Sequence, residues 1–393
     1  MYMNNNNTDP LLDEYLDRNL RPKTKKNYRI HLQNYQKVTG MTLTELIEEA
    51  ESEEDRGIRP RNRKIKKHLK NFHKYLESGD YTTLSVQINL SSVRSFYRYF
   101  DIQLPTQRSK YKKDKINITT NDLPSKDEIS KAIKFSNIKY QAIILTMCSS
   151  SMGASEIISL KVKDLIDGLG KDVSLNQDGL IDINKTRKML ELKKNNIITW
   201  NVTRQKTGHK YITFSTPEAL DAILNYLESH PPSSPDDSLF RAIGKKQMAV
   251  KSLFEYFRKL NKRCGWVLLG KQSYFRSHHL RKFWANQMEK RALGYRNSRL
   301  LMGHTGETVQ GLTGAAYFKP DHDHLRQLYL QSMDAVMINW KVKTEVVNDE
   351  KLEKMEEKIR KLEEEDRKKN ELLDAIINDP NVLKELQKKK NAN

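Results

Sequence analysis

Apolar residues recur at helical spacing through residues 9–105, and the polar positions between them are mostly charged. The clearest stripe consists of Ile65, Leu69, Phe72 and Leu76. Steps of three and four residues place such side chains on one helix face, so four helices with aromatic interiors are predicted to form a small bundle. N-caps are expected at Thr24, Thr44 and Ser85, and Gly40 is expected to end a helix. Residues 1–8, rich in Asn, are expected to be a disordered tail.

The polar and basic stretch 106–121 predicts a linker to a second domain over residues 122–337. Ser125 and Glu128 form a capping box at the start of that domain. After Gly179 the apolar period changes from helical to alternating, which predicts strands over 180–183, 198–204 and 211–214. The last two strands are joined by a turn over residues 206–209 and should form a hairpin. Thr216 and Pro217 are expected to begin the next helix, as N-cap and first helical residue.

These patterns predict an α+β fold that is mostly α, with a helical N-terminal bundle followed by a mixed α/β domain. Residues 338–393 are expected to form a charged helical tail, in which apolar residues occupy alternating heptad positions. Those positions are Leu352, Met355, Ile359 and Leu362. Two interpretations of the tail stay open: a short coiled coil, or a charged helix that packs on its own domain or a neighbour.

The charge balance narrows the choice of partner. Seventy Lys and Arg against fifty Asp and Glu give a net charge of +20, which favours a polyanion, with nucleic acid as the leading candidate. A cluster of seven basic residues without an acid runs from Arg59 to Lys70. It could be a solvated helix face, but its place at a helix start favours contact with DNA phosphates. The residues expected to make these contacts are Arg59, Arg61, Arg63, Lys64 and Lys67.

Cysteine usage and hydropathy argue against a disulfide-rich, zinc-binding, membrane-spanning or secreted protein. The two isolated cysteines, Cys148 and Cys264, supply neither a disulfide framework nor a zinc site, and Cys148 lies in an apolar run typical of a core. The apolar runs are too short to cross a membrane, and the N-terminus has no signal-peptide pattern. We therefore expect a cytoplasmic, nucleoid-associated protein with no membrane contact, cofactor or small-molecule substrate.

Candidate chemistry is concentrated near the end of the second domain. His278 and Arg281 are three residues apart, so on a helix they share a face and can hold a phosphate together. His304 adds a further donor in Leu301-Met302-Gly303-His304, and Tyr317 adds a phenol that can act as a covalent nucleophile. Each piece is weak alone, whereas their order and spacing in a very basic chain form a stronger signal.

This set, from His278-His279-Leu280-Arg281 to Tyr317, resembles the C-terminal signature of the tyrosine recombinases, or phage-type integrases. The resemblance extends roughly from Leu11 to Met333. It implies an N-terminal core-binding domain and a catalytic domain that close around duplex DNA as a clamp. It also implies site-specific recombination that integrates or excises a mobile or viral element, with four copies of the protein on a synapse.

The resemblance assigns a role to each residue. Tyr317 would form a 3′-phosphotyrosyl link, with Arg281, His278 and His304 around the phosphorus, and neither a metal nor a cofactor would take part. Lys206, in the hairpin turn, matches the family's lysine that protonates the leaving oxygen. His279 is expected to be structural, because the functional histidine of the family pattern falls on His278.

One position departs from the family pattern. The family's first catalytic arginine falls on Gly153, in Ser151-Met152-Gly153-Ala154-Ser155-Glu156. Loss of one preorganised charge is expected to cost about 3 kcal/mol of transition-state stabilisation. Either another basic residue such as Arg204 or Arg187 reaches in, or the enzyme is slow, or the protein is a relative that binds DNA without cutting it.

A different chemistry is possible at residues 321–324, where two carboxylates and two imidazoles follow one another. These are metal-ligand types and would suit a metal-dependent nuclease, but on a helix only Asp321 and His324 share a face. The favoured interpretation is that the acids cap the helix that follows Pro320.

Overall fold

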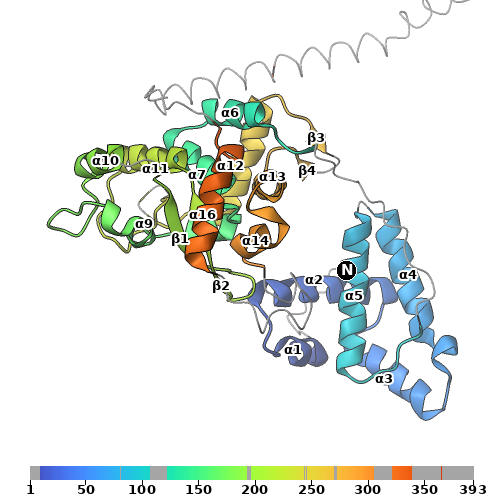
Figure 1. Cartoon of the computed structure of the whole chain (residues 1–393). Coiled ribbons are helices and arrows are strands. Elements are labelled where there is room, and N and C mark those ends of the chain that lie inside the picture. The colour runs from blue at the N-terminus through green and yellow to red at the C-terminus, as the bar shows by residue number, and fades with distance from the viewer. Residues whose placement is uncertain are drawn as a thin grey trace, which may run out of the picture. The chain divides into compact units, whose positions relative to one another are not determined.

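The chain divides into two compact units, Met1–Asn117 and Ile118–Asn393, and each is described by itself (Figure 1). The structure, a computed structural model, describes residues 9–79, 81–106, 122–192, 196–242, 244, 246–269, 272–304, 321–338 and 364. The fold is mostly helical, with an N-terminal helical region and a second unit that carries a small sheet, which confirms the predicted fold class. In the described residues, no helix combines the length and the apolar character needed to span a membrane.

The first unit is a helical bundle around an aromatic core. Its helices are α1 (Pro10–Leu16), α2 (Pro22–Thr39), α3 (Leu43–Asp55), α4 (Lys64–Ser78) and α5 (Thr83–Tyr99). The predicted stripe of α4 is buried, and Tyr35 meets Tyr97 at 3.1 Å between their hydroxyl oxygens. Gly40 ends α2 with φ of 72°, as predicted. The apolar period therefore located these helices correctly.

The helix starts in this unit differ from the predicted ones. Thr42, with Glu45, forms the capping box of α3, and Thr82 caps α5. Thr44 instead donates to the carboxylate of Asp9, whose oxygens also accept backbone N–H groups at the start of α3. Pro22 begins α2, two residues before Thr24. At α3 and α5 a second hydroxyl residue nearby serves as the cap, whereas α2 begins at Pro22 without a side-chain cap.

The second unit surrounds one antiparallel hairpin with helices. Strands β1 (Ile198–Thr203) and β2 (Lys210–Ser215) pair with Trp200 opposite Thr213, as the alternating pattern predicted. A second, very short hairpin pairs β3 (Leu268–Leu269) with β4 (Gln272–Ser273). The helices are α6 (Lys126–Lys134), α7 (Ile138–Ser150), α8 (Ala154–Ser159), α9 (Val162–Leu169), α10 (Ile183–Glu191), α11 (Pro217–Ser229), α12 (Val250–Arg263), α13 (Ser277–Glu289), α14 (Gly294–Leu301) and α16 (His322–Ser332).

Helix starts in this unit were predicted correctly where the capping residues were distinctive. Ser125 and Glu128 form the predicted capping box of α6, and Thr216 precedes Pro217 at the start of α11. The strand predicted over 180–183 is wrong: Ile181 forms only an isolated bridge with Leu175, and Asp182 caps α10. A run of so few apolar residues does not distinguish a strand from a helix start.

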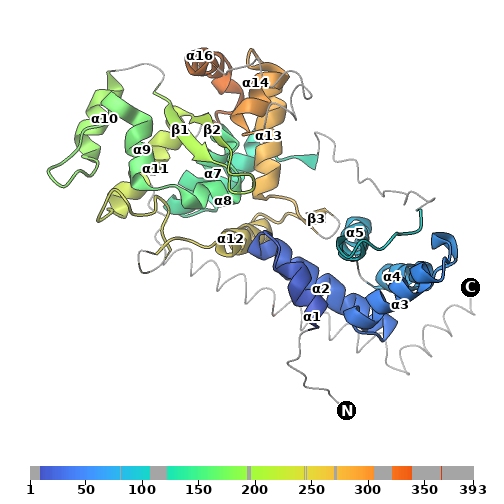
Figure 2. The ribbon, with the colours of Figure 1, turned by 90° about the horizontal axis from the view of Figure 1, so that it is seen from below.

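Helix α7 is the centre of the second unit. Every residue from Ala142 to Ser150 is buried, including Cys148, because α11, α13 and β2 all pack against this helix. Figure 2 shows α7 beneath the hairpin, with α13 beside it. A helix that is apolar on every side is typical of a core position.

The last carbonyl groups of α7 lack partners within the helix and are bound by side chains from other elements. The Ser149 oxygen accepts from the indole N–H of Trp284 on α13 at 2.7 Å and from the Tyr329 hydroxyl on α16 at 2.8 Å. The Ser150 oxygen accepts from the Thr213 hydroxyl on β2 at 2.7 Å. Three elements distant in sequence are thus joined to one helix end.

We expect Thr213→Val to destabilise the second unit by about 1–3 kcal/mol. The substitution keeps the shape of the side chain but leaves the buried Ser150 carbonyl without its donor. Urea-induced unfolding of the full chain measures the change. Thr203→Val, on an exposed position of β1, is the matched control and should leave the midpoint unchanged. Equal midpoints for the two variants would contradict this account of the helix end.

Candidate functional site

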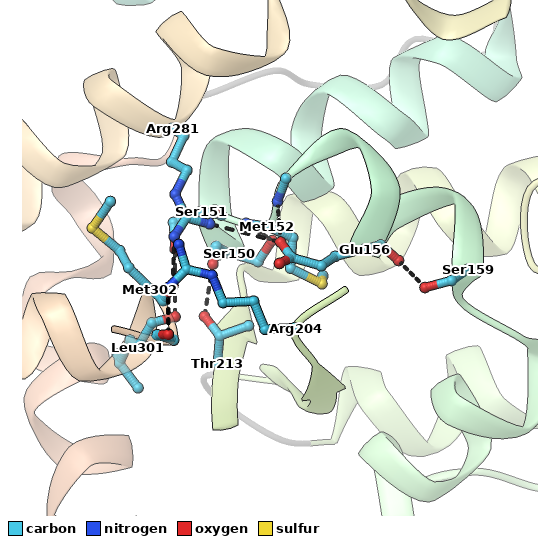
Figure 3. A network of polar contacts seen from close by, with 12 residues as sticks. Ser150, Ser151, Met152, Glu156, Ser159, Arg204, Thr213, Arg281, Leu301 and Met302 are labelled. Atoms are coloured by element: carbon cyan, nitrogen blue, oxygen red, sulfur yellow. Dashed lines mark hydrogen bonds and ion pairs between the residues drawn. The ribbon is translucent and has the colours of Figure 1, made fainter. Parts of the chain in front are cut away.

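Arg281 lies where the C-terminal ends of two helices meet. Its Nη1 donates to the Ser151 carbonyl at 2.7 Å and its Nη2 to the Met302 carbonyl (Figure 3). Ser151 is the C-cap of α7 and Met302 the C-cap of α14. Free carbonyl groups give a helix C-terminus a partial negative charge, so both ends favour a cation between them. The two caps therefore hold this guanidinium in a fixed orientation.

A single carboxylate accompanies Arg281. Glu156 Oε2 lies 3.7 Å from Arg281 Nη1, and the side chains are only 12% and 8% exposed. The same carboxylate accepts the backbone N–H of Gly153, which precedes α8. Burial lowers the pKa of Arg281, while Tyr211 and Glu156 oppose this effect. Since arginine titrates far above neutral pH, the group remains a cation.

Gly303 shapes the turn beneath Arg281. The N–H of Gly303 donates to the Leu300 carbonyl at 2.8 Å and that of His304 to the Arg299 carbonyl at 3.0 Å, which is a Schellman end to α14. This motif requires the left-handed backbone, and Gly303 has φ of 68°. A Cβ at this position would lie 2.6 Å from Cδ1 of Tyr211, so glycine is required both by the backbone and by the packing.

His304 follows this turn and is neutral at pH 7. Burial, with the nearby guanidinium groups of Arg281, Arg204 and Arg299, lowers its pKa to about 4. His278, on the first turn of α13, also has a lowered pKa, because part of its ring leaves water and Lys282 lies near it. The family resemblance places both histidines around the phosphorus, where a protonated imidazole would add positive charge. In the free protein they are instead neutral hydrogen-bonding groups.

Arg204 brings a second guanidinium to the site. It immediately follows β1, and its Nη1 donates to the Gly303 carbonyl at 2.6 Å. Its charge acts on both Arg281 and His304. Figure 3 shows Arg204 and Arg281 approaching one place from different elements. The other arginine considered, Arg187, instead binds Asp221 at 2.9 Å on α11 and lies outside this set.

Lys206 is exposed in the turn that Arg204 begins. The N–H of Arg204 donates to the His209 carbonyl at 2.8 Å, and its carbonyl accepts the N–H of Gly208 at 2.8 Å. The backbone of Arg204 thus closes the turn that presents Lys206. Sequence reasoning named Arg204 without placing it, because its partner Gly303 lies 99 positions away.

Two other predicted sites have different outcomes. Tyr317 lies outside the described residues. Asp321 caps α16 by accepting the N–H groups of Asp323 and His324, which confirms the capping interpretation. Across the described ranges of the chain, no group of three or more metal-ligating side chains comes together. His279 is fully buried and its Nε2 lies 2.7 Å from Arg276 Nη2, a packed position.

The basic cluster of the first unit is only partly free. Arg59, Arg61 and Lys67 are exposed. Arg63 is buried instead, donating to the Ile58 carbonyl at 2.8 Å and pairing with Glu54. Lys64, although exposed, pairs with Glu49 at 2.8 Å. Because of these internal partners, Arg63 stabilises the fold and is not available to a phosphate. The spacing of basic residues in the sequence did not reveal those partners.

We expect Gly303→Ala to destabilise the second unit and to displace Tyr211. Left-handed backbone costs about 1 kcal/mol for alanine, and overpacking against the Tyr211 ring adds about 1–3 kcal/mol. Gly265→Ala is the matched control, since Gly265 has φ of 69° and open space around it. Thermal unfolding of both variants separates the cost of the left-handed backbone from the cost of overpacking against Tyr211. Equal losses would show that the contact with Tyr211 is unimportant.

The lowered pKa of His304 predicts a pH dependence of stability. As the pH falls from about 6.5 to 4, the unfolded chain protonates this histidine while the folded chain does not, so folding stability decreases. The contribution of His304 is about 1–3 kcal/mol. Urea unfolding at pH 7 and pH 5 should show a smaller loss for His304→Gln than for wild type. Parallel losses would mean that His304 titrates normally.

Comparison with known proteins identifies the fold of this unit. Residues 124–311 match the model of the Phage integrase family. No curated protein sequence is significantly similar to the chain. Among solved structures, a lambda integrase tetramer bound to a Holliday junction is 16% identical with a TM-score of 0.51. That likeness covers 79% of this chain and 76% of the lambda protein. XerA recombinase is 19% identical over 82% of this chain and 97% of its own, with a TM-score of 0.35.

The lambda structure at this identity shows a shared fold, and the family match lies within the second unit, over the helices and hairpin that build the Arg281 site. The segment 124–311, which carries the Arg281 site, is therefore similar in sequence to the phage integrase, or tyrosine recombinase, family.

Proposed function

We propose that this protein is a site-specific DNA recombinase that cuts and rejoins duplex DNA through a 3′-phosphotyrosyl intermediate. Its biological role would be to integrate or excise a mobile or viral element. The observation that carries this proposal is the pair of guanidinium groups, Arg281 and Arg204, held beside the ends of α7 and α14.

The charge of the site favours a phosphodiester. Arg281 pairs with one carboxylate, Glu156, and is repelled by the charge of Arg204. Two cations with one anion in a partly desolvated place leave a positive charge that an anion can compensate. A phosphate presents oxygen atoms that match the fork of an arginine, so DNA is a suitable ligand.

The proposed reaction conserves the number of phosphodiester bonds. The Tyr317 phenol gives up its proton and its oxygen forms a bond to the scissile phosphorus, while the bond from phosphorus to the 5′ oxygen breaks. The 5′ oxygen leaves with a proton. Rejoining reverses these steps when a 5′ hydroxyl attacks the phosphotyrosine, so the reaction requires no external energy source.

Each remaining residue has a role in this scheme. Arg281 binds the non-bridging oxygens, and His278 and His304 donate hydrogen bonds to them as neutral imidazoles. Lys206, exposed in the hairpin turn, is the proposed acid that protonates the leaving 5′ oxygen. Neither a metal nor a cofactor is part of the proposed mechanism.

Gly153 is the position at which we infer that the family's first arginine is missing. It precedes α8 with φ of −78°, a conformation that any residue can adopt. The backbone therefore does not explain why glycine stands there. This departure supports a second candidate, a relative that binds DNA with the same two units but no longer cuts it.

The partners follow from the same proposal. The exposed residues Arg59, Arg61 and Lys67 of the first unit would contact DNA phosphates, with Lys64 joining only if it leaves Glu49. Assembly of four copies on DNA is proposed by analogy with the lambda integrase tetramer bound to a Holliday junction.

A covalent-adduct assay tests the proposal. Full-length protein is mixed with nicked duplexes made from DNA that flanks its own gene, in the presence of EDTA. A protein–DNA species that survives SDS is expected for wild type and should be lost in Tyr317→Phe, because the phenol oxygen is the nucleophile. Tyr295→Phe, an exposed tyrosine on α14, is the matched control and should leave the adduct unchanged.

An adduct that persists in Tyr317→Phe would rule out the assigned nucleophile. Tight, salt-sensitive binding without any adduct would instead favour the relative that only binds DNA. DNA cleavage that occurs without EDTA, leaves no adduct and is lost when EDTA is added would point to a metal-dependent reaction.

A further inference from the structure

Arg204 has an unusual environment for a partly buried arginine. Among the described residues, its guanidinium group makes one hydrogen bond, from Nη1 to the Gly303 carbonyl. Within the same described set, no carboxylate forms an ion pair with it. The other arginines near the turn do have acidic partners, since Arg299 pairs with Glu289 at 2.9 Å and Arg281 with Glu156.

The charge of Arg204 acts on neighbouring groups of the site. The guanidinium of Arg204 lowers the pKa values of both Arg281 and His304. A structural arginine would be expected to face a carboxylate, as Arg187 faces Asp221 and Glu228. A bound anion would remove the repulsion between Arg204 and Arg281, and it would satisfy the N–H groups of Arg204 that have no acceptor among the described residues.

Gly153 contacts Glu156, the carboxylate that pairs with Arg281. A Cβ built at Gly153 would be 3.1 Å from Glu156 Oε2, the atom that also pairs with Arg281 Nη1. A side chain at residue 153 would therefore emerge beside Arg281 from α8. Arg204 reaches Arg281 from the hairpin, so it can supply a charge near Arg281 without occupying position 153.

We propose that Arg204 is the second phosphate-binding arginine of this protein and acts with Arg281 in place of a residue absent at Gly153. The inference rests on the proposed function for the identity of the ligand, a DNA phosphodiester. The two guanidinium groups hold the phosphate from two elements, α13 and the end of β1. Each is oriented by a carbonyl of the turn after α14, at Met302 and Gly303.

The position of Arg204 also links two parts of the proposed reaction. Its side chain contacts the turn that precedes His304, while its backbone closes the turn that carries Lys206. A phosphate bound to this guanidinium would therefore have a fixed position relative to Lys206, the proposed acid, which lies two residues further along the chain. A charge supplied from α8 would have no such connection.

The test compares rates of covalent-adduct formation in the full-length protein. Arg204→Gln removes the charge but retains an N–H donor for the Gly303 carbonyl, and Arg204→Lys restores the charge without the fork. We expect Arg204→Gln to slow adduct formation about 100-fold and Arg204→Lys to recover part of the rate. Arg187→Gln, the matched control on α10, should react at the wild-type rate. Melting temperatures of all variants check that the fold is intact.

The double variant Gly153→Arg with Arg204→Gln tests whether a charge supplied from position 153 can replace the charge of Arg204. If the missing charge is what matters, arginine at 153 should recover part of the rate that Arg204→Gln loses. Wild-type rates in folded Arg204→Gln would overturn the inference, and so would failure of both Arg204→Lys and the double variant to recover any activity.

A second measurement requires no DNA cleavage. Binding of inorganic phosphate to the full-length protein is followed by calorimetry at low ionic strength, and we expect Arg204→Gln and Arg281→Gln each to weaken it about tenfold or more. Arg187→Gln should bind as wild type does. Absence of an adduct together with phosphate binding that depends on Arg204 would reject the recombinase proposal and retain the phosphate site. Binding unchanged in Arg204→Gln, or absent in wild type, would reject the site itself.

Discussion

The free carbonyl groups at the end of α7 are the constraint on which the second unit depends. A buried helix end must find hydrogen-bond donors, because unsatisfied carbonyl groups in a core are costly. Here the donors are side chains from α13, α16 and β2. Arg281 is a further donor of this kind, since it binds the carbonyl of Ser151, the first residue after the helix. The group assigned to phosphate binding is therefore held by the same contacts that assemble the fold.

This arrangement explains how a largely buried cation persists with a single carboxylate partner among the described residues. The two helix ends that contact Arg281 supply partial negative charge through carbonyl oxygens, which a phosphate does not have to displace. Glu156 lies further away, at 3.7 Å from Nη1, and is shared with the backbone N–H of Gly153. Burial, together with the positive field of the nearby arginines, lowers the pKa of His304 to about 4 in the free protein. An arriving anion would reduce that field, so binding and the protonation of His304 are coupled.

The sequence located most elements, because each depends on residues close together in the chain. The β1–β2 hairpin, the Ser125–Glu128 box and the start of α11 all have local signals and were predicted correctly. Other features depend on contacts between distant residues. The burial of Arg63 against Glu54 and the contact from Arg204 to Gly303 join segments that no local pattern connects. The apolar run at 180–183 failed for a different reason, since it is too short to fix a period.

Gly153 occupies the motif position but has no charge, whereas Arg204 lies outside the motif and carries one. The residue at a motif position and the charge at a site are therefore separate questions. A motif records which residue in the chain carries a charge, whereas a phosphate responds only to where the charge lies in space. Glu156 on α8 pairs with Arg281, and Arg204 at the end of β1 acts on Arg281 through its charge. The carbonyl groups of Met302 and Gly303 orient both guanidinium groups. In our proposal the phosphate site is therefore defined by this turn and not by position 153.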